Sequence, residues 1–84
     1  MQLSWDIHAW EDYLYWQQTD KAVMKKINDL IKECLRTPFD GRGKPEALKA
    51  NYAGYWSRRI TGEHRLVYRV YEDRLHVVQC RYHY

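Results

Sequence analysis

The pattern of apolar and polar positions divides the 84-residue chain into a helical first half and a strand-like second half. Residues 2–5 predict a short strand. After it, apolar residues recur at three- and four-residue steps, the spacing of one face of a helix. Asp6 is well placed to cap this first helix. Its predicted apolar face consists of Ile7, Trp10, Tyr13 and Leu14.

A longer and more regular pattern predicts a second amphipathic helix, which Thr19 or Asp20 can cap. Lysines fall between its apolar positions, so we expect one buried and one solvated side. Both prolines and two of the four glycines then follow within residues 37–45, which predicts a loop. The apolar stripe consists of Val23, Met24, Ile27, Leu30, Ile31, Cys34 and Leu35.

The second half alternates in the manner of β-strands. Residues 55–60, 63–71 and 75–82 are strand-like, and short polar or glycine-containing segments separate them. The pattern predicts a twisted antiparallel meander with the two helices packed on one face. We therefore expect a single α+β domain spanning residues 1–84, at a length that supports one modest core.

The last hairpin allows two registers. A two-residue turn at residues 72–73 lacks the Asn or Gly that such turns prefer. A three-residue loop pairs Tyr71 with Leu75 instead, and we favour it because it gathers the cations and an imidazole on one surface. In that register, one face holds Leu66, Tyr68, Val70, Val78, Cys80 and Tyr82, and the other holds Arg65, Arg69, Gln79, Arg81 and His83.

The charge distribution adds a second signal, because the net charge of +3 is unevenly spread along the sequence. Residues 1–20 contain four acids and no Lys or Arg, so every basic side chain lies in residues 21–84. A basic body with interleaved aromatic residues is typical of a nucleic-acid binder. On charge alone, an ordinary solvated surface explains the pattern equally well.

The two cysteines, Cys34 and Cys80, form no C-x-x-C pair and no zinc spacing with the histidines. The sequence thus supports neither a disulfide framework nor a metal site, and we expect no cofactor. The first residues lack the features of a signal peptide, and no apolar run approaches the length of a membrane span. A cytoplasmic protein without a membrane association is expected.

A basic and aromatic sheet face suits single-stranded RNA. Cleaving RNA needs further groups, which deprotonate the 2′-hydroxyl, neutralise the phosphoryl charge and protonate the leaving oxygen. Glu46 is our candidate base, Arg65 the candidate phosphate ligand, and His83 the candidate acid. The ordinary alternatives are a solvated loop Glu46, an ion pair between Arg65 and Glu63, and an inert terminal histidine.

The chain ends on an imidazole and a phenol, Arg81-Tyr82-His83-Tyr84, directly after a strand-like run. Chain ends normally fray unless contacts hold them, so the run before them suggests that the terminus is part of a site. The other histidines, His8, His64 and His76, have no comparable setting. We interpret them as structural or surface residues.

Several blocks along the whole chain resemble one family. They are Asp12-Tyr13-Leu14-Tyr15-Trp16, Lys44-Pro45-Glu46, Leu48-Lys49, Trp56-Ser57-Arg58-Arg59-Ile60-Thr61, Glu63-His64-Arg65-Leu66-Val67-Tyr68 and Cys80-Arg81-Tyr82-His83-Tyr84. The resemblance is to the YoeB family of mRNA interferase toxins, in the RelE/ParE superfamily. It implies a RelE-like microbial RNase fold and a toxin of a type II toxin–antitoxin pair.

The resemblance also implies an activity, which is ribosome-dependent cleavage of mRNA in the A site by attack of the 2′-hydroxyl without a metal. It makes Glu46 the base, His83 the acid and Arg65 the clamp on the transition state. Tyr84 would orient the substrate. Supporting or RNA-binding roles fall to Lys49, Arg59, Glu63 and Arg81.

The implied partners are mRNA, the ribosome with its rRNA, a YefM-like antitoxin and a second copy of the chain. Two other classes remain open. A ParE-like toxin of the same fold would bind DNA gyrase and cleave no RNA, and a noncatalytic module would bind RNA without needing His83.

Overall fold

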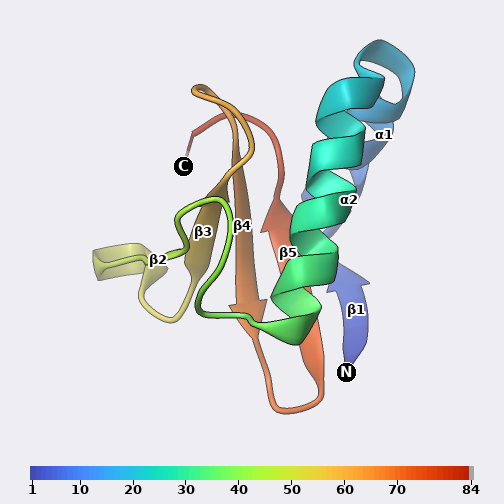
Figure 1. Ribbon diagram of the computed structural model, residues 1–84. Helices are drawn as coiled ribbons and strands as arrows, with labels where there is room; N and C mark the ends of the chain where they lie inside the picture. The colour runs from blue at the N-terminus through green and yellow to red at the C-terminus, as the bar shows by residue number, and fades with distance from the viewer. Residues whose placement is uncertain (84) are drawn as a thin grey trace.

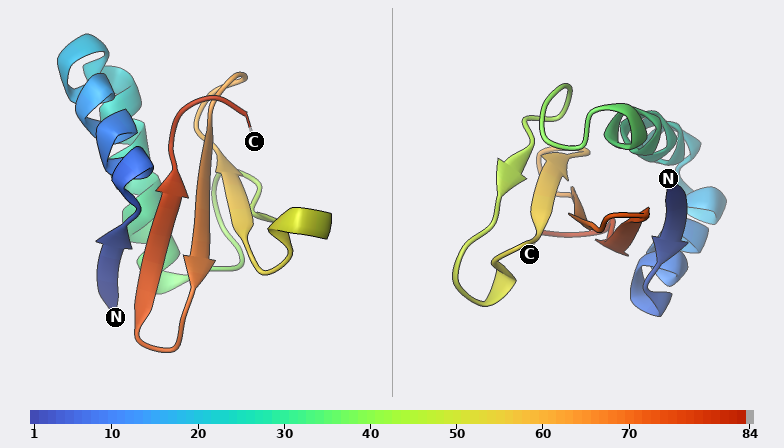
Figure 2. Two further views of the ribbon diagram at one scale, coloured as in Figure 1. Left: turned by 180° about the vertical axis from the view of Figure 1, so that it is seen from behind. Right: turned by 90° about the horizontal axis from the view of Figure 1, so that it is seen from below.

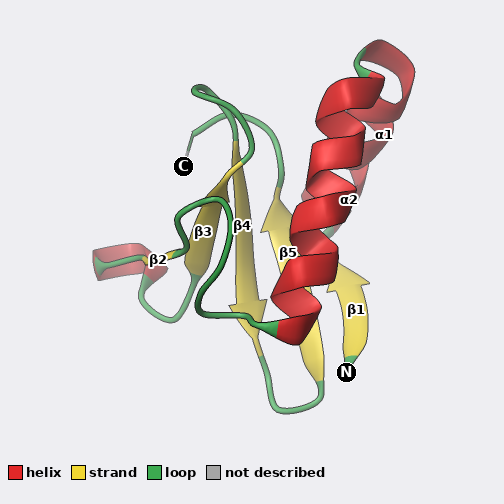
Figure 3. Cartoon of the chain, in the orientation of Figure 1, coloured by secondary structure: helices red, strands yellow, loops and turns green. Residues whose placement is uncertain are grey.

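Two helices cover one face of a five-stranded sheet in the computed structural model, which describes residues 1–83 (Figures 1 and 2). The α+β class predicted from the sequence is confirmed. The strands lie in the order β1-β5-β4-β3-β2. The elements are β1 (Gln2–Trp5), α1 (Ile7–Thr19), α2 (Lys21–Arg36), β2 (Glu46–Ala47), a 3-10 turn η1 (Ala50–Tyr52), β3 (Trp56–Arg59), β4 (Arg65–Val70) and β5 (Arg74–Gln79) (Figure 3).

Both helices begin where the sequence predicts. The Asp6 carboxylate accepts the backbone N–H of His8, and the Asp20 carboxylate accepts those of Ala22 and Val23. These bonds satisfy N–H groups that have no partner within the helix. Asp20 alone separates the helices, which therefore form a tight hairpin.

The buried side of α2 is the predicted stripe, with Ile27, Leu30, Ile31 and Cys34 in the core. The predicted apolar face of α1 is wrong in part. Ala9 and Trp16 are its buried residues, whereas Ile7, Trp10 and Leu14 are exposed. A helix at the edge of a layer buries only the narrow stripe that meets its neighbours, so its apolar periodicity overstates its burial.

The sheet is mixed, which corrects the expectation of a purely antiparallel sheet. β1 pairs in parallel with β5, from Gln2 opposite Arg74 to Trp5 opposite Val77, and all other neighbours are antiparallel. The paired residues are about seventy positions apart in sequence, so no local turn signal announces them. β2 was not among the predicted strands; it forms because Glu46 and Ala47 pair with β3.

The favoured register of the last hairpin is wrong at its turn. Only residues 72–73 form the turn, because the Tyr71 N–H donates to the Arg74 carbonyl at 2.8 Å. A β-bulge next to Val67 then adds one residue to β5, so that Val67 pairs with Gln79 as the longer loop predicted. A bulge moves the later side chains of the strand to the opposite face of the sheet. The local sequence pattern did not reveal this bulge.

This bulge changes which residues of β5 are buried. Val77, not Val78, faces the core, and after the bulge Cys80 faces it as well. The predicted strand continues to residue 82, but β5 ends at Gln79 and Tyr82 is exposed. The candidate residues Arg81 and His83 are thus outside the sheet.

Candidate functional site

The loop at residues 37–45 is held by one buried side chain, Arg58. Arg58 projects from β3 toward the helices and is fully buried. All five guanidinium N–H donors have acceptors, which is the complete capacity of this side chain. The acceptors are the Tyr68 hydroxyl at 3.1 Å, a Glu33 carboxylate oxygen at 3.1 Å, and the backbone carbonyls of Arg42 at 3.0 Å, Asp40 at 2.8 Å and Thr37.

Glu33 of α2 reinforces the same loop. Its carboxylate accepts the backbone N–H of Arg42 and pairs with the side chains of Arg42 and Arg58. The hydrogen bond from the Arg42 backbone, followed by the side chains of Arg42 and Arg58, holds the pKa of Glu33 below its usual value. The loop is therefore fixed by hydrogen bonds from both the sheet and α2. Sequence reasoning had given Arg58 no role, although alternation along β3 places it on the core side.

Three candidate residues lie on the sheet face away from the helices. Glu46 pairs with Ser57, and Arg59 pairs with Arg65. Because side chains alternate along a strand and paired residues share a face, Glu46, Arg59 and Arg65 project on the side opposite Arg58. The structure thus brings a carboxylate and two guanidinium groups together on one surface.

Arg65 is oriented by its own turn. Its Nη1 donates to the carbonyls of Thr61 at 2.8 Å and His64 at 3.1 Å. Arg65 forms no ion pair with Glu63. The alternative interpretation, in which Arg65 merely pairs with that acid, is therefore wrong. Glu63 is exposed in the turn before β4, and Lys49 is exposed just before η1.

The tail after β5 crosses the sheet on this same face and ends near β3 (Figure 2). The Arg65 N–H donates to the Tyr82 carbonyl at 3.0 Å, so the backbone next to His83 lies beside Arg65. His83 lines a cavity of about 360 Å³ together with Asp6, which caps α1, and Asp12 of α1. Glu46, Arg59 and Arg65 do not line that cavity. Tyr84 lies outside the described residues.

The base of the tail is fixed to α1. Trp16 Nε1 donates to the Cys80 carbonyl at 2.9 Å, and the Asp12 carboxylate accepts the Cys80 N–H at 3.2 Å. Burial raises the pKa of Asp12, although the Cys80 hydrogen bond and the Arg81 charge oppose that shift. Arg81 stacks on Tyr15, with 3.5 Å from its guanidinium carbon to the ring centroid. The expectation that Arg81 faces the same surface as Arg65 is therefore wrong, because the strand ends before it.

Two of the other histidines are structural, as predicted. His76 Nδ1 and the Ser4 hydroxyl form a hydrogen bond of 2.7 Å between β5 and β1. His64 Nδ1 accepts the Tyr82 N–H at 2.7 Å, a contact with the tail that the sequence did not indicate. His8 is exposed on α1.

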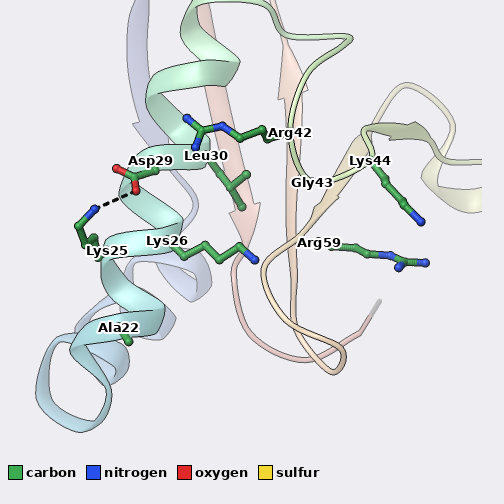
Figure 4. Close-up of a pocket in the computed structure, with 9 residues that line it drawn as sticks. All are labelled: Ala22, Lys25, Lys26, Asp29, Leu30, Arg42, Gly43, Lys44 and Arg59. Atoms are coloured by element: carbon green, nitrogen blue, oxygen red, sulfur yellow. Dashed lines mark hydrogen bonds and ion pairs between the residues drawn. The ribbon is translucent and has the colours of Figure 1, made fainter.

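A basic cleft of about 590 Å³ lies between α2 and the Arg58-held loop (Figure 4). Lys26 reaches from α2 toward Arg59, while Lys44 and Arg59 extend together away from the helix. Asp29 is its one acidic lining residue, and Asp29 pairs with Lys25 at 3.2 Å. The lining of the cleft is therefore strongly cationic. Its lining residues are Ala22, Lys25, Lys26, Asp29, Leu30, Arg42, Gly43, Lys44 and Arg59.

Among residues 1–83, no group of His, Cys, Asp and Glu side chains is arranged to hold a metal ion. No helix in this described part is long and apolar enough to cross a membrane.

Comparison with known proteins decides the family. The family model of the YoeB-like toxin of bacterial type II toxin–antitoxin systems matches residues 5–84. The chain is 63% identical to the toxin YoeB of Escherichia coli K12, over the full length of both proteins. The chain belongs to the YoeB family of toxins.

Solved structures of YoeB proteins agree with the fold. The YoeB/ParE toxin of Agrobacterium tumefaciens is 59% identical, with complete coverage of both chains and a TM-score of 0.98. Staphylococcus aureus YoeB is 48% identical and covers this chain fully, with 98% of its own chain matched. It was solved as a dimer, at a TM-score of 0.93, and in a heterotetrameric complex with YefM, at 0.92. The RelE-like fold expected from the family resemblance is confirmed.

Proposed function

We propose that this YoeB-family toxin is a ribosome-dependent endoribonuclease that cuts mRNA in the A site. The observation that carries the proposal is the shared sheet face of Glu46, Arg59 and Arg65, which the tail bearing His83 also crosses. A base, two cations and an imidazole are the groups that RNA cleavage needs.

The proposed reaction uses the RNA as its own nucleophile. Glu46 removes the proton of the 2′-hydroxyl, and the 2′-oxygen attacks the adjacent phosphorus. Arg65, with Arg59 beside it, stabilises the charge on the phosphoryl oxygens. The bond to the 5′-oxygen breaks, and His83 donates a proton to that oxygen. The products are a 2′,3′-cyclic phosphate and a 5′-hydroxyl end.

Because His83 lines a cavity that Glu46, Arg59 and Arg65 do not line, the ribosome has a physical role in the proposal. Glu46 and Arg59 are exposed, and their side chains make no hydrogen bond or ion pair with another described residue. Bound RNA would supply the contacts that bring His83 from its cavity to the scissile bond. Lys49, Glu63 and Arg81 would support the substrate or the site, and Tyr84 would orient the substrate.

The family supports two protein partners in the cytoplasm. One is a YefM-like antitoxin, since S. aureus YoeB forms a complex with YefM. The other is a second copy, since the same relative forms a dimer. The exposed Trp10 packs against the half-buried rings of Trp5 and Tyr13, at 5.8 Å between ring centroids in each pair, and offers a surface for such contacts.

The decisive experiment incubates the purified protein with a defined mRNA, with and without programmed ribosomes, and maps new 5′ ends by primer extension. We expect cuts inside the A-site codon only when ribosomes are present, and none with His83→Ala. A folded, antitoxin-free protein that makes no cuts would overturn the proposal. DNA damage on expression would then favour the gyrase-directed alternative.

A further inference from the structure

The cleft beside α2 has the character of a ligand site, and of its lining residues only Arg59 has a proposed catalytic role. Of its cations, Lys25 is paired with Asp29 and Arg42 with Glu33. The side chains of Lys26, Lys44 and Arg59 make no hydrogen bond or ion pair with any described residue. Three unpaired cations around one hollow repel each other, and an anion relieves that repulsion.

The loop wall of this cleft is preorganised. Gly43 has a φ of 83° and its carbonyl accepts the Arg59 N–H at 2.7 Å, which fixes the loop against β3. Arg58 and Glu33 hold the preceding residues. Lys44 is therefore presented from a fixed backbone, with little ordering left to occur on binding.

We propose that this cleft binds the sugar-phosphate backbone of an RNA segment outside the scissile nucleotides. Unpaired lysines with an arginine suit phosphodiesters, which carry regularly spaced charges and need no unique geometry from lysine. The cleft borders the proposed site, since Arg59 lines the cleft and shares the sheet face of Glu46 and Arg65. This inference rests on the proposed function for its choice of RNA.

The test compares two double variants of equal charge. Lys26→Gln with Lys44→Gln removes cleft cations, and Lys21→Gln with Lys32→Gln removes exposed lysines of α2 outside the cleft. Binding is measured against salt concentration, once with an uncleavable mRNA oligonucleotide and once with programmed ribosomes. For a single strand, each lost phosphate contact lowers the slope of log affinity against log salt by roughly 0.7, so we expect about 1.4.

A reduced slope with the oligonucleotide assigns the cleft to mRNA, and a reduction with ribosomes alone assigns it to rRNA. Equal slopes for both double variants in both arms would overturn the proposal. So would weakened binding of the antitoxin alone, which would assign the cleft to an acidic protein segment. Because binding is measured without cleavage, a wild type that binds through the cleft but never cuts would refute the proposed reaction only.

A second inference concerns the tail. Tyr82 has a φ of 64°, a left-handed conformation that a tyrosine adopts only when contacts hold it. Its N–H donates to His64 Nδ1 at 2.7 Å, and its carbonyl accepts from the Arg65 N–H at 3.0 Å. His64 is itself fixed. Its ring packs edge-on against Trp16, with 4.7 Å between ring centroids, and its backbone N–H donates to the Thr61 hydroxyl.

The geometry points to His64 as a positioning residue for the tail that carries His83. Tyr82 is the residue before His83, so its two backbone bonds determine where the His83 backbone starts. Without the His64 acceptor, the strained Tyr82 conformation would relax. Displacements of about 1 Å can reduce catalysis roughly 10²-fold. The expected effect of His64 on cleavage rests on the proposed function.

Two variants of nearly equal shape distinguish the effect of the His64 hydrogen bond from the effect of losing the ring. His64→Asn keeps an acceptor at the Nδ1 position, and His64→Leu has the same branching without one. We expect His64→Leu to lose hydrogen-exchange protection at the Tyr82 amide and at least ~10-fold in kcat with little change in KM. His64→Asn should retain most of both.

Equal loss of protection and of kcat in the two variants would overturn the inference, because the ring contacts would then explain it. Amide exchange does not depend on cleavage. An inactive wild type whose Tyr82 protection is lost only in His64→Leu would refute the proposed reaction and leave His64 as the anchor of the tail.

Discussion

The loop at residues 37–45 and the tail at residues 80–83 both carry or flank candidate functional groups, yet they are held in opposite ways. One buried side chain, Arg58, donates three hydrogen bonds to loop carbonyls, those of Thr37, Asp40 and Arg42. The tail is held by single bonds from several residues, among them Trp16 and His64. Because so many of the loop's contacts converge on Arg58, we expect the stability of the loop to depend strongly on that residue, whereas the dispersed contacts of the tail should allow it to shift without unfolding the domain.

The largest expected effect is on catalysis through the tail. General acid–base groups contribute ~10²–10⁴-fold in rate, so His83→Ala should lower the A-site cleavage rate by about that factor. Its side chain is exposed, so the unfolding transition should be unchanged. His8→Ala removes another exposed imidazole and should cleave normally. Equal activity of the two variants would remove His83 from the mechanism.

The next largest effect separates the two arginines of β3. Arg58→Met leaves the Glu33 carboxylate without its buried partner and the Thr37 and Arg42 carbonyls without donors, so we expect a loss of about 3–5 kcal/mol in unfolding free energy. Arg59→Met changes an exposed side chain and should cost less than ~0.5 kcal/mol. Urea unfolding of both variants measures the difference. A small loss for Arg58→Met would show that the loop does not depend on it.

The two regions should also respond to pH with opposite signs. The pKa of Glu33 is lowered in the folded protein, so its stabilisation is complete above the unfolded value and is lost as pH falls through the folded value. The pKa of Asp12 is raised, so its contribution is complete below its unfolded value near 3.8 and is lost as pH rises through the folded value.

Urea unfolding between about pH 3 and pH 7 tests these signs. Glu33→Gln should flatten the loss of stability toward acid. Asp12→Asn, which keeps an acceptor for Cys80, should make that loss steeper. Parallel curves for the wild type and both variants would contradict the assignment.

The smallest expected effect is on the reactivity of the two cysteine thiols, which compares the two regions directly. Burial raises the pKa of Cys80, at the base of the tail, to about 12, and it also raises the pKa of Cys34, next to Glu33. Neither thiol should react with an alkylating reagent at neutral pH in the native protein. At low urea, dispersed contacts should let Cys80 react first, as measured with Cys34→Ser and Cys80→Ser. Earlier labelling of Cys34 would reverse the comparison.

Much of the fold is readable from local patterns. The caps at Asp6 and Asp20, the apolar stripe of α2 and the strands β3 to β5 follow from side-chain spacing and backbone chemistry. Trp10 shows the limit, because its helical spacing predicted burial and the structure leaves it exposed. Periodicity states which residues share a face, and only the neighbours decide whether that face is covered.

The candidate site divides in the same way. Residue chemistry and the family blocks determined Glu46, Arg59, Arg65 and His83 as candidates, since the groups needed for RNA cleavage are few. Tertiary structure alone decided that β1 lies parallel to β5 and that a bulge follows Val67. It also decided that Arg58 fixes the loop and His64 the tail. These features depend on contacts between segments far apart in the chain, where no local propensity acts, because their free energy arises only when the folded chain brings both partners together.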